Sequence, residues 1–139
     1  KGTLTDWGTR VPMIANWRNT IQPGQVRHEL TDASDILPSL VDVADAELPA
    51  GVQLDGQSLL AQMNKGAPPR RWIFAEHKGQ CFVRSQRWKL YNDGRFYDME
   101  ADPDEKEPLD TNALPQAAAV AFDELQSAFA GLDYRSPSD

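Results

Sequence analysis

The first twelve residues form a polar, glycine-containing loop of a kind that could hold an anion. They read Lys-Gly-Thr-Leu-Thr-Asp-Trp-Gly-Thr-Arg-Val-Pro, and the chain then continues into the apolar stretch 13–17. Lys1 would supply a compact, rotatable positive charge, and Gly2 would let the backbone approach a ligand closely. Because ligands of open α/β sheets bind beyond the strand ends, these residues are compatible with an anion site at Lys1. The alternative is a solvated, frayed terminal lysine.

Two further side chains could take part in chemistry, His77 and Cys81. His77 ends an expected strand and precedes the turn residues Lys78 and Gly79. A histidine at such a position can line a substrate rim or exchange a proton near neutral pH, and the alternative is an ordinary exposed hairpin residue. Cys81 is the only cysteine in the sequence, so no internal disulfide can form. We interpret it as a small, buried strand residue.

The composition argues against several classes of function. The 139 residues are enough for one modest domain. Fourteen basic and 21 acidic residues give a formal net charge of −7, which argues against binding to nucleic acid or to an anionic membrane. No apolar run approaches the roughly 18 residues of a membrane span. The chain begins with Lys rather than Met, so we expect it to be processed, truncated or part of a longer protein.

The first half of the chain predicts one strand and two helices. Residues 11–17 are apolar on both faces, which is typical of a buried strand in a larger sheet. Apolar residues recur at helical spacing over 36–44, and Pro38 restricts the start of this helix, because proline fits only its first turn. We therefore expect the N-cap within residues 34–35. Residues 55–60 should then turn into a second, short helix that ends near Asn64.

The second half predicts a small antiparallel sheet covered by a helix. Turn signals at Lys78-Gly79 and at Asn92-Asp93-Gly94 separate aromatic-rich segments. The four expected strands are residues 72–76, 81–84, 87–91 and 95–98. A helix should begin at Pro115, which suits a first helical position. The apolar stripe of this helix should pack on the sheet, and it comprises Phe122, Leu125, Phe129 and Leu132.

A change in composition divides the two halves. Residues 65–71 read Lys-Gly-Ala-Pro-Pro-Arg-Arg and have the character of a linker. Helix and loop signals precede this segment, and alternating, aromatic-rich strands follow it. We therefore predict two parts, residues 1–66 and residues 67–139.

The N-terminal loop resembles a motif of the type I sulfatases, a family of the alkaline-phosphatase-like superfamily. That motif commonly reads Lys-Gly-Thr-x-Tyr-Glu-Gly-Gly-x-Arg-Val-Pro. This sequence departs from it at Thr5, which replaces the common aromatic, at Asp6, which replaces Glu, and at Trp7, which replaces the first of the paired glycines. In the family the lysine of the motif touches the sulfate group of the substrate, so the resemblance places that role on Lys1.

Four more stretches resemble sulfatase motifs in the same order along the chain. Residues 30–40 resemble a stretch that ends in Asp-x-x-Pro-Thr-Leu, and residues 54–59 resemble Asp-Gly-x-Ser-Leu. Residues 83–98 resemble Val-Arg-x-x-x-Trp-Lys followed by Leu-Tyr-Asp-Leu, and residues 102–109 resemble Asp-Pro-x-Glu-x-x-Asn-Leu. The resemblance covers nearly the whole chain, and five motifs in order are hard to explain by chance.

The resemblance implies an α/β fold and the C-terminal portion of a sulfatase. The last strand and helices of the catalytic domain (residues 1–66) would precede a small four-stranded antiparallel sheet packed by a C-terminal helix (residues 67–139). The parent would hydrolyse sulfate monoesters, and its substrate would be a sulfated small molecule or a sulfated sugar. Because sulfatase C-terminal subdomains lend residues to the substrate pocket, His77 becomes a candidate substrate-binding residue.

The resemblance also implies cofactors that this sequence does not supply. Sulfatases use a formylglycine made from Cys-x-Pro-x-Arg, or its serine version, and Cys81 is followed by a different pattern. They also hold a calcium ion, which needs six to eight oxygens from converging segments, and no full calcium loop is present. We therefore expect the N-terminal remainder of the same protein to provide both, and this chain alone to be inactive.

Two alternatives stay open at the level of sequence. The chain could belong to a related phosphonate or phosphate ester hydrolase of the same superfamily. It could also be a free-standing acidic interaction domain with no enzymatic role. The compartment is open as well, although the resemblance is compatible with a periplasmic or secreted protein.

Overall fold

The computed structural model describes residues 2–65 and 68–132 of the chain. Its contacts divide the chain into two compact units. The sheet unit comprises Lys1–Pro12 and Trp72–Asp139, and the helical unit comprises Met13–Arg71. The boundary predicted between residues 66 and 67 lies outside the described residues. The prediction placed the N-terminal loop with the helices in residues 1–66, whereas the structure places Lys1–Pro12 in the same unit as the sheet.

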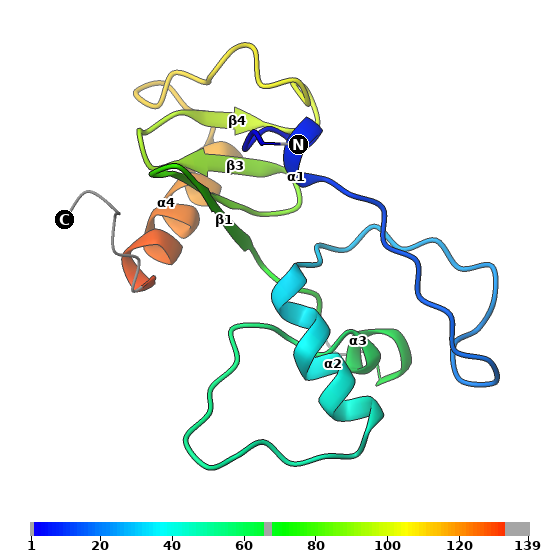
Figure 1. The fold of residues 1–139 in the computed structure, drawn as a ribbon. Helices are drawn as coiled ribbons and strands as arrows, with labels where there is room; N and C mark the ends of the chain where they lie inside the picture. Colours follow the sequence, from blue (N-terminus) through cyan, green and yellow to red (C-terminus); the bar gives the residue numbers. More distant parts are fainter. Residues whose placement is uncertain (1, 66–67, 133–139) are drawn as a thin grey trace. The chain divides into compact units, whose positions relative to one another are not determined.

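The sheet unit contains the four-stranded antiparallel sheet that the sequence predicts. Its strands are β1 (Ile73–His77), β2 (Gln80–Arg84), β3 (Trp88–Tyr91) and β4 (Phe96–Asp98), and they pair in chain order (Figure 1). The β1–β2 hairpin turns at Lys78 and Gly79, whose φ angles are 54° and 81°. Positive φ at both central residues is the geometry that matches the twist of a two-residue hairpin.

Apolar side chains cover one face of this sheet beneath helix α4 (Gln116–Gly131). This core cluster comprises Val83, Leu90, Phe96, Ala118 and Leu125, with Phe122 and Phe129 packed against it. The rings of Phe96 and Phe122 meet edge to face with centroids 5.2 Å apart, a favoured aromatic geometry. The predicted packing of a C-terminal helix on the sheet is confirmed. The helix begins at Gln116, one residue after the predicted Pro115.

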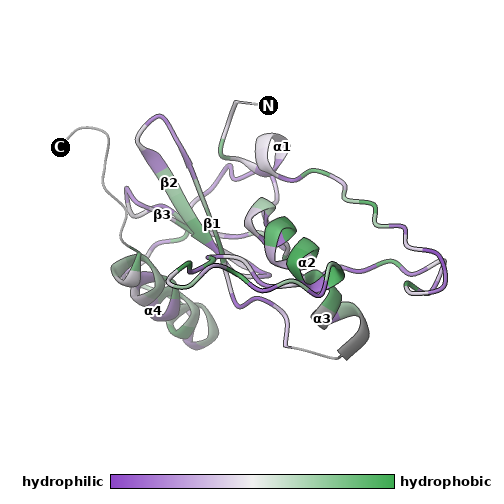
Figure 2. Ribbon diagram, turned by 60° about the horizontal axis from the view of Figure 1, so that its bottom comes forward, coloured by the Kyte–Doolittle hydropathy of each residue, from purple (hydrophilic) through white to green (hydrophobic). Residues whose placement is uncertain are grey.

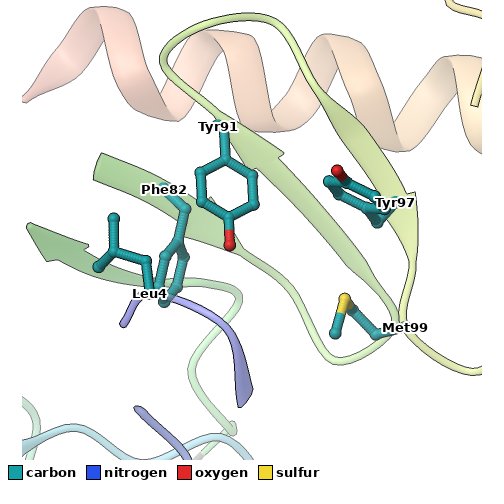
Figure 3. Close-up of a cluster of buried hydrophobic side chains, with 5 residues drawn as sticks. All are labelled: Leu4, Phe82, Tyr91, Tyr97 and Met99. Atoms are coloured by element: carbon teal, nitrogen blue, oxygen red, sulfur yellow. The ribbon is translucent and has the colours of Figure 1, made fainter. Parts of the chain in front are cut away.

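The opposite face of the sheet is covered by the N-terminal segment. Because side chains alternate along a strand, Phe82 and Tyr91 point away from α4. They form a second buried cluster with Tyr97, Met99 and Leu4, and Leu4 comes from the N-terminal segment (Figure 3). The short helix α1 (Asp6–Thr9) follows Leu4 directly. The sheet is therefore a middle layer with a helix on one face and the N-terminal loop on the other.

The helical unit contains the 3₁₀ turn η1 (Ala33–Asp35), α2 (Ile36–Val43) and α3 (Leu59–Lys65). Both predicted helices are present. Asp32 caps η1 by accepting the Ser34 N–H, while Asp35 accepts the Asp32 N–H, which completes a capping box. The N-cap of α2 is Asp35, within the predicted residues 34–35, although no side chain caps α2 directly because η1 precedes it.

The strand predicted at residues 11–17 is absent from the structure, and this part of the predicted fold is wrong for the chain as described. The segment has no helix or strand, and Val11 and Ile14 are 62% and 93% exposed. A strand needs a hydrogen-bonded neighbour, and none of the described residues forms a ladder with this stretch. Trp17, the last residue of this stretch, is 38% exposed. An apolar run forms a strand only where a neighbouring strand is available for pairing, and the described residues provide none for this stretch.

Helix α2 also leaves its apolar residues exposed. Its hydropathy is visible as green in Figure 2, and Ile36, Leu37 and Leu40 are each at least half exposed. None of its residues is buried. Among the helices that the structure describes, none combines the length and the apolar character that a membrane span requires.

Candidate functional site

The N-terminal loop is the candidate site, and its described part begins at Gly2. Lys1, the predicted anion ligand, lies outside the described residues. Gly2 has a φ of 88°, a conformation that glycine adopts without strain. Gly8 has no room for a side chain, because a Cβ there would lie 2.1 Å from the Thr3 carbonyl oxygen. Both glycines of the motif therefore shape the loop that follows Lys1.

Lys89 holds this loop from within the sheet. Its side chain is fully buried, and its Nζ donates to the Leu4 carbonyl oxygen at 2.6 Å and to Glu105 Oε1 at 2.8 Å. The ammonium also lies 4.1 Å from the centre of the Phe82 ring. Burial lowers the pKa of Lys89, and the hydrogen bond and charge of Glu105 act in the opposite direction. A buried charge needs such partners, because an unpaired one is costly.

The Glu105 carboxylate accepts hydrogen bonds from both the loop and strand β3. Its Oε1 accepts the Asp6 backbone N–H at 3.2 Å, and its Oε2 accepts the Tyr91 hydroxyl. The Glu105 side chain is 2% exposed. Burial raises the pKa of the Tyr91 hydroxyl, and the hydrogen bond to Glu105 acts in the same direction. One carboxylate therefore joins Lys89 and Tyr91 of the sheet to the backbone of the loop.

Two further contacts tie the loop side chains to the sheet unit. Asp6 forms an ion pair with Arg84 of β2, and its Oδ1 lies 3.9 Å from Lys89 Nζ. The Trp7 indole N–H donates to Asp104 Oδ1 at 3.1 Å, although 80% of Trp7 is exposed. We call the group formed by Asp6, Arg84, Lys89, Tyr91 and Glu105 the clamp.

The charged groups of the clamp are bonded to one another and to the backbone of the loop. The lysine of the clamp is fully buried and its carboxylates are already paired with donors. The clamp as a unit was not predicted from the sequence. The available signal was that Arg84, Lys89 and Glu105 all lie in stretches that resemble sulfatase motifs.

His77 lies on the same face of the sheet as the clamp but at its far end. In the β1–β2 pairing, Ile73 is opposite Arg84 and His77 is opposite Gln80. Alternation along β1 puts Ile73 and His77 on one face. The four residue steps between them span about 13 Å of strand. The structure therefore does not bring His77 into the clamp, and its role at a substrate rim stays a prediction.

A second buried carboxylate organises the helical unit. Asp35 is fully buried, and Arg70 Nη1 lies 3.3 Å from its Oδ1, which also accepts the Gln57 N–H at 2.8 Å. Ser39 Oγ donates to the Asp35 carbonyl oxygen and accepts the Leu59 N–H. Two sulfatase-like stretches, residues 30–40 and 54–59, are thereby joined. Asp35 thus takes part both in the capping box of η1 and in an ion pair with Arg70.

The described residues do not fit the cofactors that the resemblance implies. Within residues 2–65 and 68–132, no group of three His, Cys, Asp or Glu side chains could hold a metal ion. Cys81 is 1% exposed, and burial raises the pKa of its thiol, which disfavours the reactive thiolate. That calcium and formylglycine are supplied by the N-terminal remainder of the protein stays a prediction.

Comparison with known proteins finds relatives of a single kind, although no family model matches. Arylsulfatase A of Bos taurus is 37% identical over an alignment covering 74% of this chain and 22% of that protein. Steryl-sulfatase of Mus musculus is 31% identical, covering 63% of this chain and 14% of that protein. N-acetylgalactosamine-6-sulfatase of Sus scrofa is 36% identical, covering 68% of this chain and 20% of that protein.

Solved structures of the same kind also align with the chain. A 2-O GAG sulfatase is 24% identical with a TM-score of 0.49, covering 69% of this chain and 23% of that one. A sulfatase in complex with its substrate D-glucosamine-2-N,6-O-disulfate is 30% identical with a TM-score of 0.49, covering 69% and 22%. The chain spans at most about a fifth of the length of the curated relatives above. On the similarity to these relatives, the chain belongs to the sulfatase family.

Proposed function

We propose that the chain is the C-terminal portion of a sulfuric ester hydrolase that cleaves sulfate monoesters to an alcohol and sulfate. The observation that carries the proposal is the clamp on the N-terminal loop. This loop resembles the sulfate-contacting motif of sulfatases, and Lys89 and Glu105 hold its backbone with hydrogen bonds to Leu4 and Asp6. A loop that must present a charge at a fixed place benefits from such rigid support.

In this proposal Lys1 contacts the sulfate group of the substrate. Charge on the sulfuryl oxygens and the leaving oxygen changes during hydrolysis of the ester. A fixed ammonium near those oxygens stabilises the transition state without reorganising first. His77 would lie at the rim of the substrate pocket. In this proposal the calcium and the formylglycine of the family come from the N-terminal remainder of the protein.

That remainder is also the proposed partner of this chain. Contiguous exposed apolar surface commonly marks a site of association. The helical unit contains several exposed apolar side chains. Leu37 and Leu40 of α2 are 53% and 57% exposed, and Ile14, earlier in the chain, is 93% exposed. We propose that the N-terminal remainder covers them and supplies neighbours for residues 11–17.

The proposed substrate class is a sulfated small molecule or a sulfated sugar. The names of the relatives span steryl and N-acetylgalactosamine-6 sulfates, so the shared feature is the sulfate monoester rather than the alcohol. No feature of the described sheet unit indicates which alcohol carries the sulfate.

The test compares sulfate and phosphate esters of one phenol as substrates of the full-length protein. The proposal expects a higher kcat/KM for the aryl sulfate, and no turnover of it by residues 1–139 alone. Preference for the phosphate or a phosphonate ester would favour the related hydrolase instead.

The free-standing interaction domain is tested with the purified 139-residue chain. Because its apolar surface is exposed, the proposal expects self-association in light scattering. A monodisperse monomer with one sharp unfolding transition would favour an independent domain.

A further inference from the structure

We propose that Lys89 and Glu105 are positioning residues that set the loop geometry through which Lys1 acts on the sulfate ester. This inference rests on the proposed function, because it concerns the same lysine. Neither residue touches substrate in this account. Each acts through the backbone of the loop, one on each side of Thr5.

The contacts that carry the inference are made to backbone atoms. Lys89 Nζ donates to the Leu4 carbonyl oxygen at 2.6 Å, and the Asp6 N–H donates to Glu105 Oε1 at 3.2 Å. Bonds to two backbone groups two residues apart restrain the path of the chain independently of the loop side chains. These contacts join residues separated by 85 and 99 positions in the sequence, so local sequence preferences cannot replace them.

The chemistry of the clamp also points to positioning. A buried ion pair contributes little to stability compared with well-packed apolar side chains of similar volume. Here the ammonium of the pair lies 4.1 Å and 5.0 Å from the ring centres of Phe82 and Tyr91, two members of the Leu4 cluster, so it occupies space that apolar side chains could fill. Apolar side chains in place of Lys89 and Glu105 could neither donate a hydrogen bond to the Leu4 carbonyl oxygen nor accept one from the Asp6 N–H. The ion pair therefore provides directed hydrogen bonds to the loop.

A positioning role has a measurable size. Displacing a reacting group by about 1 Å through a change outside the reaction centre can lower the rate about 10²-fold. We therefore expect loss of the clamp to lower kcat by about that factor. An exclusively structural role would lower the thermal midpoint and leave kcat unchanged below the melting range.

The experiment uses the full-length protein with an apolar clamp, the triple variant Lys89→Met, Glu105→Leu and Tyr91→Phe. Replacing all three partners together leaves no unpaired buried charge or hydroxyl among them, so the fold should persist. Leu125→Ala is the matched control, because Leu125 is 2% exposed beneath α4 on the other face of the sheet. It should lower the thermal midpoint and leave kcat unchanged.

Two measurements then separate positioning from other roles. Hydrogen exchange of the Asp6 amide in the full-length protein should become faster in the triple variant and stay unchanged in Leu125→Ala. Turnover of an aryl sulfate should fall about 10²-fold in the triple variant. If the triple variant is too unstable to assay, Tyr91→Phe alone removes one hydrogen bond to Glu105 and should lower kcat several-fold.

A double-mutant cycle with Lys1→Ala decides whether the clamp acts through Lys1. The triple variant should have little further effect on kcat once Lys1 is removed. An equal loss in both backgrounds, or an unchanged kcat in the folded triple variant, would overturn the positioning role while leaving the role of Lys1 intact. If Lys1→Ala were itself silent, the proposed function and the positioning role would both fail.

Discussion

Glycine at residues 8 and 56 is required by close backbone approach rather than by positive φ. A Cβ on Gly56 would lie 2.0 Å from the Ser34 carbonyl oxygen, and a Cβ on Gly8 would lie 2.1 Å from that of Thr3. Both obstructing atoms belong to the backbone, so neither can move aside cheaply. Each glycine lies in a stretch that resembles a sulfatase motif. The close approach of the backbone therefore explains why these two motif positions hold glycine.

Gly56→Ala should therefore destabilise the helical unit, whereas Gly131→Ala should not harm the sheet unit. Nothing lies within 4 Å of a Cβ on Gly131, the last residue of α4. Alanine in a helix is favoured over glycine by up to about 1 kcal/mol. Urea unfolding of the two variants should show opposite shifts in midpoint. Equal midpoints would contradict the close approach at Gly56.

Asp98 provides a prediction about pH. Arg87 donates to both of its oxygens, at 2.9 Å and 2.6 Å, and this hydrogen bonding holds the pKa of Asp98 below its ordinary value of 3.8. A carboxyl with a lowered pKa in the folded state stabilises the fold above its unfolded pKa, and the contribution disappears as the pH falls through the folded value.

Asp98→Asn should accordingly cost up to about 1 kcal/mol of unfolding free energy at neutral pH, because Arg87 is half exposed and such pairs contribute little. The difference from the parent should vanish in acid below the lowered pKa. Denaturant unfolding of both proteins across this pH range measures it. A cost that persists unchanged in acid would mean that the ion pair is not its cause.

At the scale of elements, α4 and the sheet hold each other through aromatic contacts. Phe122 packs edge to face on Phe96 and is partly buried. Phe122→Ala should cost about 3 kcal/mol, the low end for removal of a core phenylalanine. Val120, on the same helix, is 56% exposed, so Val120→Ala should be nearly neutral. Thermal unfolding of both variants distinguishes them, and similar midpoints would contradict helix-on-sheet packing.

The sequence predicted the sheet unit better than the helical unit for a physical reason. Alternating aromatic residues and the Asn92-Asp93-Gly94 turn are local signals, and they located all four strands within one or two residues. Residues 11–17 carried an equally clear apolar signal, but a strand also depends on a neighbour that local sequence does not specify. The N-cap of α2 falls at Asp35, within the predicted residues 34–35, whereas the 3₁₀ turn η1 and its capping box at Asp32 were not predicted.

The clamp could not be predicted from local pattern at all. Lys89 falls in an aromatic-rich strand, where a lysine ordinarily indicates a solvent-facing position. Its partners Leu4 and Glu105 lie 85 and 16 residues away. Only the shared resemblance to one family linked these stretches, and that resemblance did not say which of their atoms meet.

At the scale of the whole molecule, the membership of the chain in the sulfatase family and the position of its N-terminal loop together underlie the proposed role of Lys1. The chain belongs to the sulfatases, spans at most about a fifth of the relatives compared, and holds its N-terminal loop against the sheet. We propose that this loop presents Lys1 to the sulfate group of the substrate. The claim is specific to the ammonium, so it can be tested by changing that group alone.

The most direct measurement is the turnover of a small aryl sulfate by Lys1→Ala and Lys1→Arg variants of the full-length protein, with thermal stability measured alongside. The account predicts that Lys1→Ala lowers the rate by about 10²–10³, or about 2.7–4 kcal/mol, with little change in stability. Lys1→Arg should not restore full activity, because a planar fork replaces a point charge. Activity of Lys1→Ala within about twofold of the parent would contradict the account.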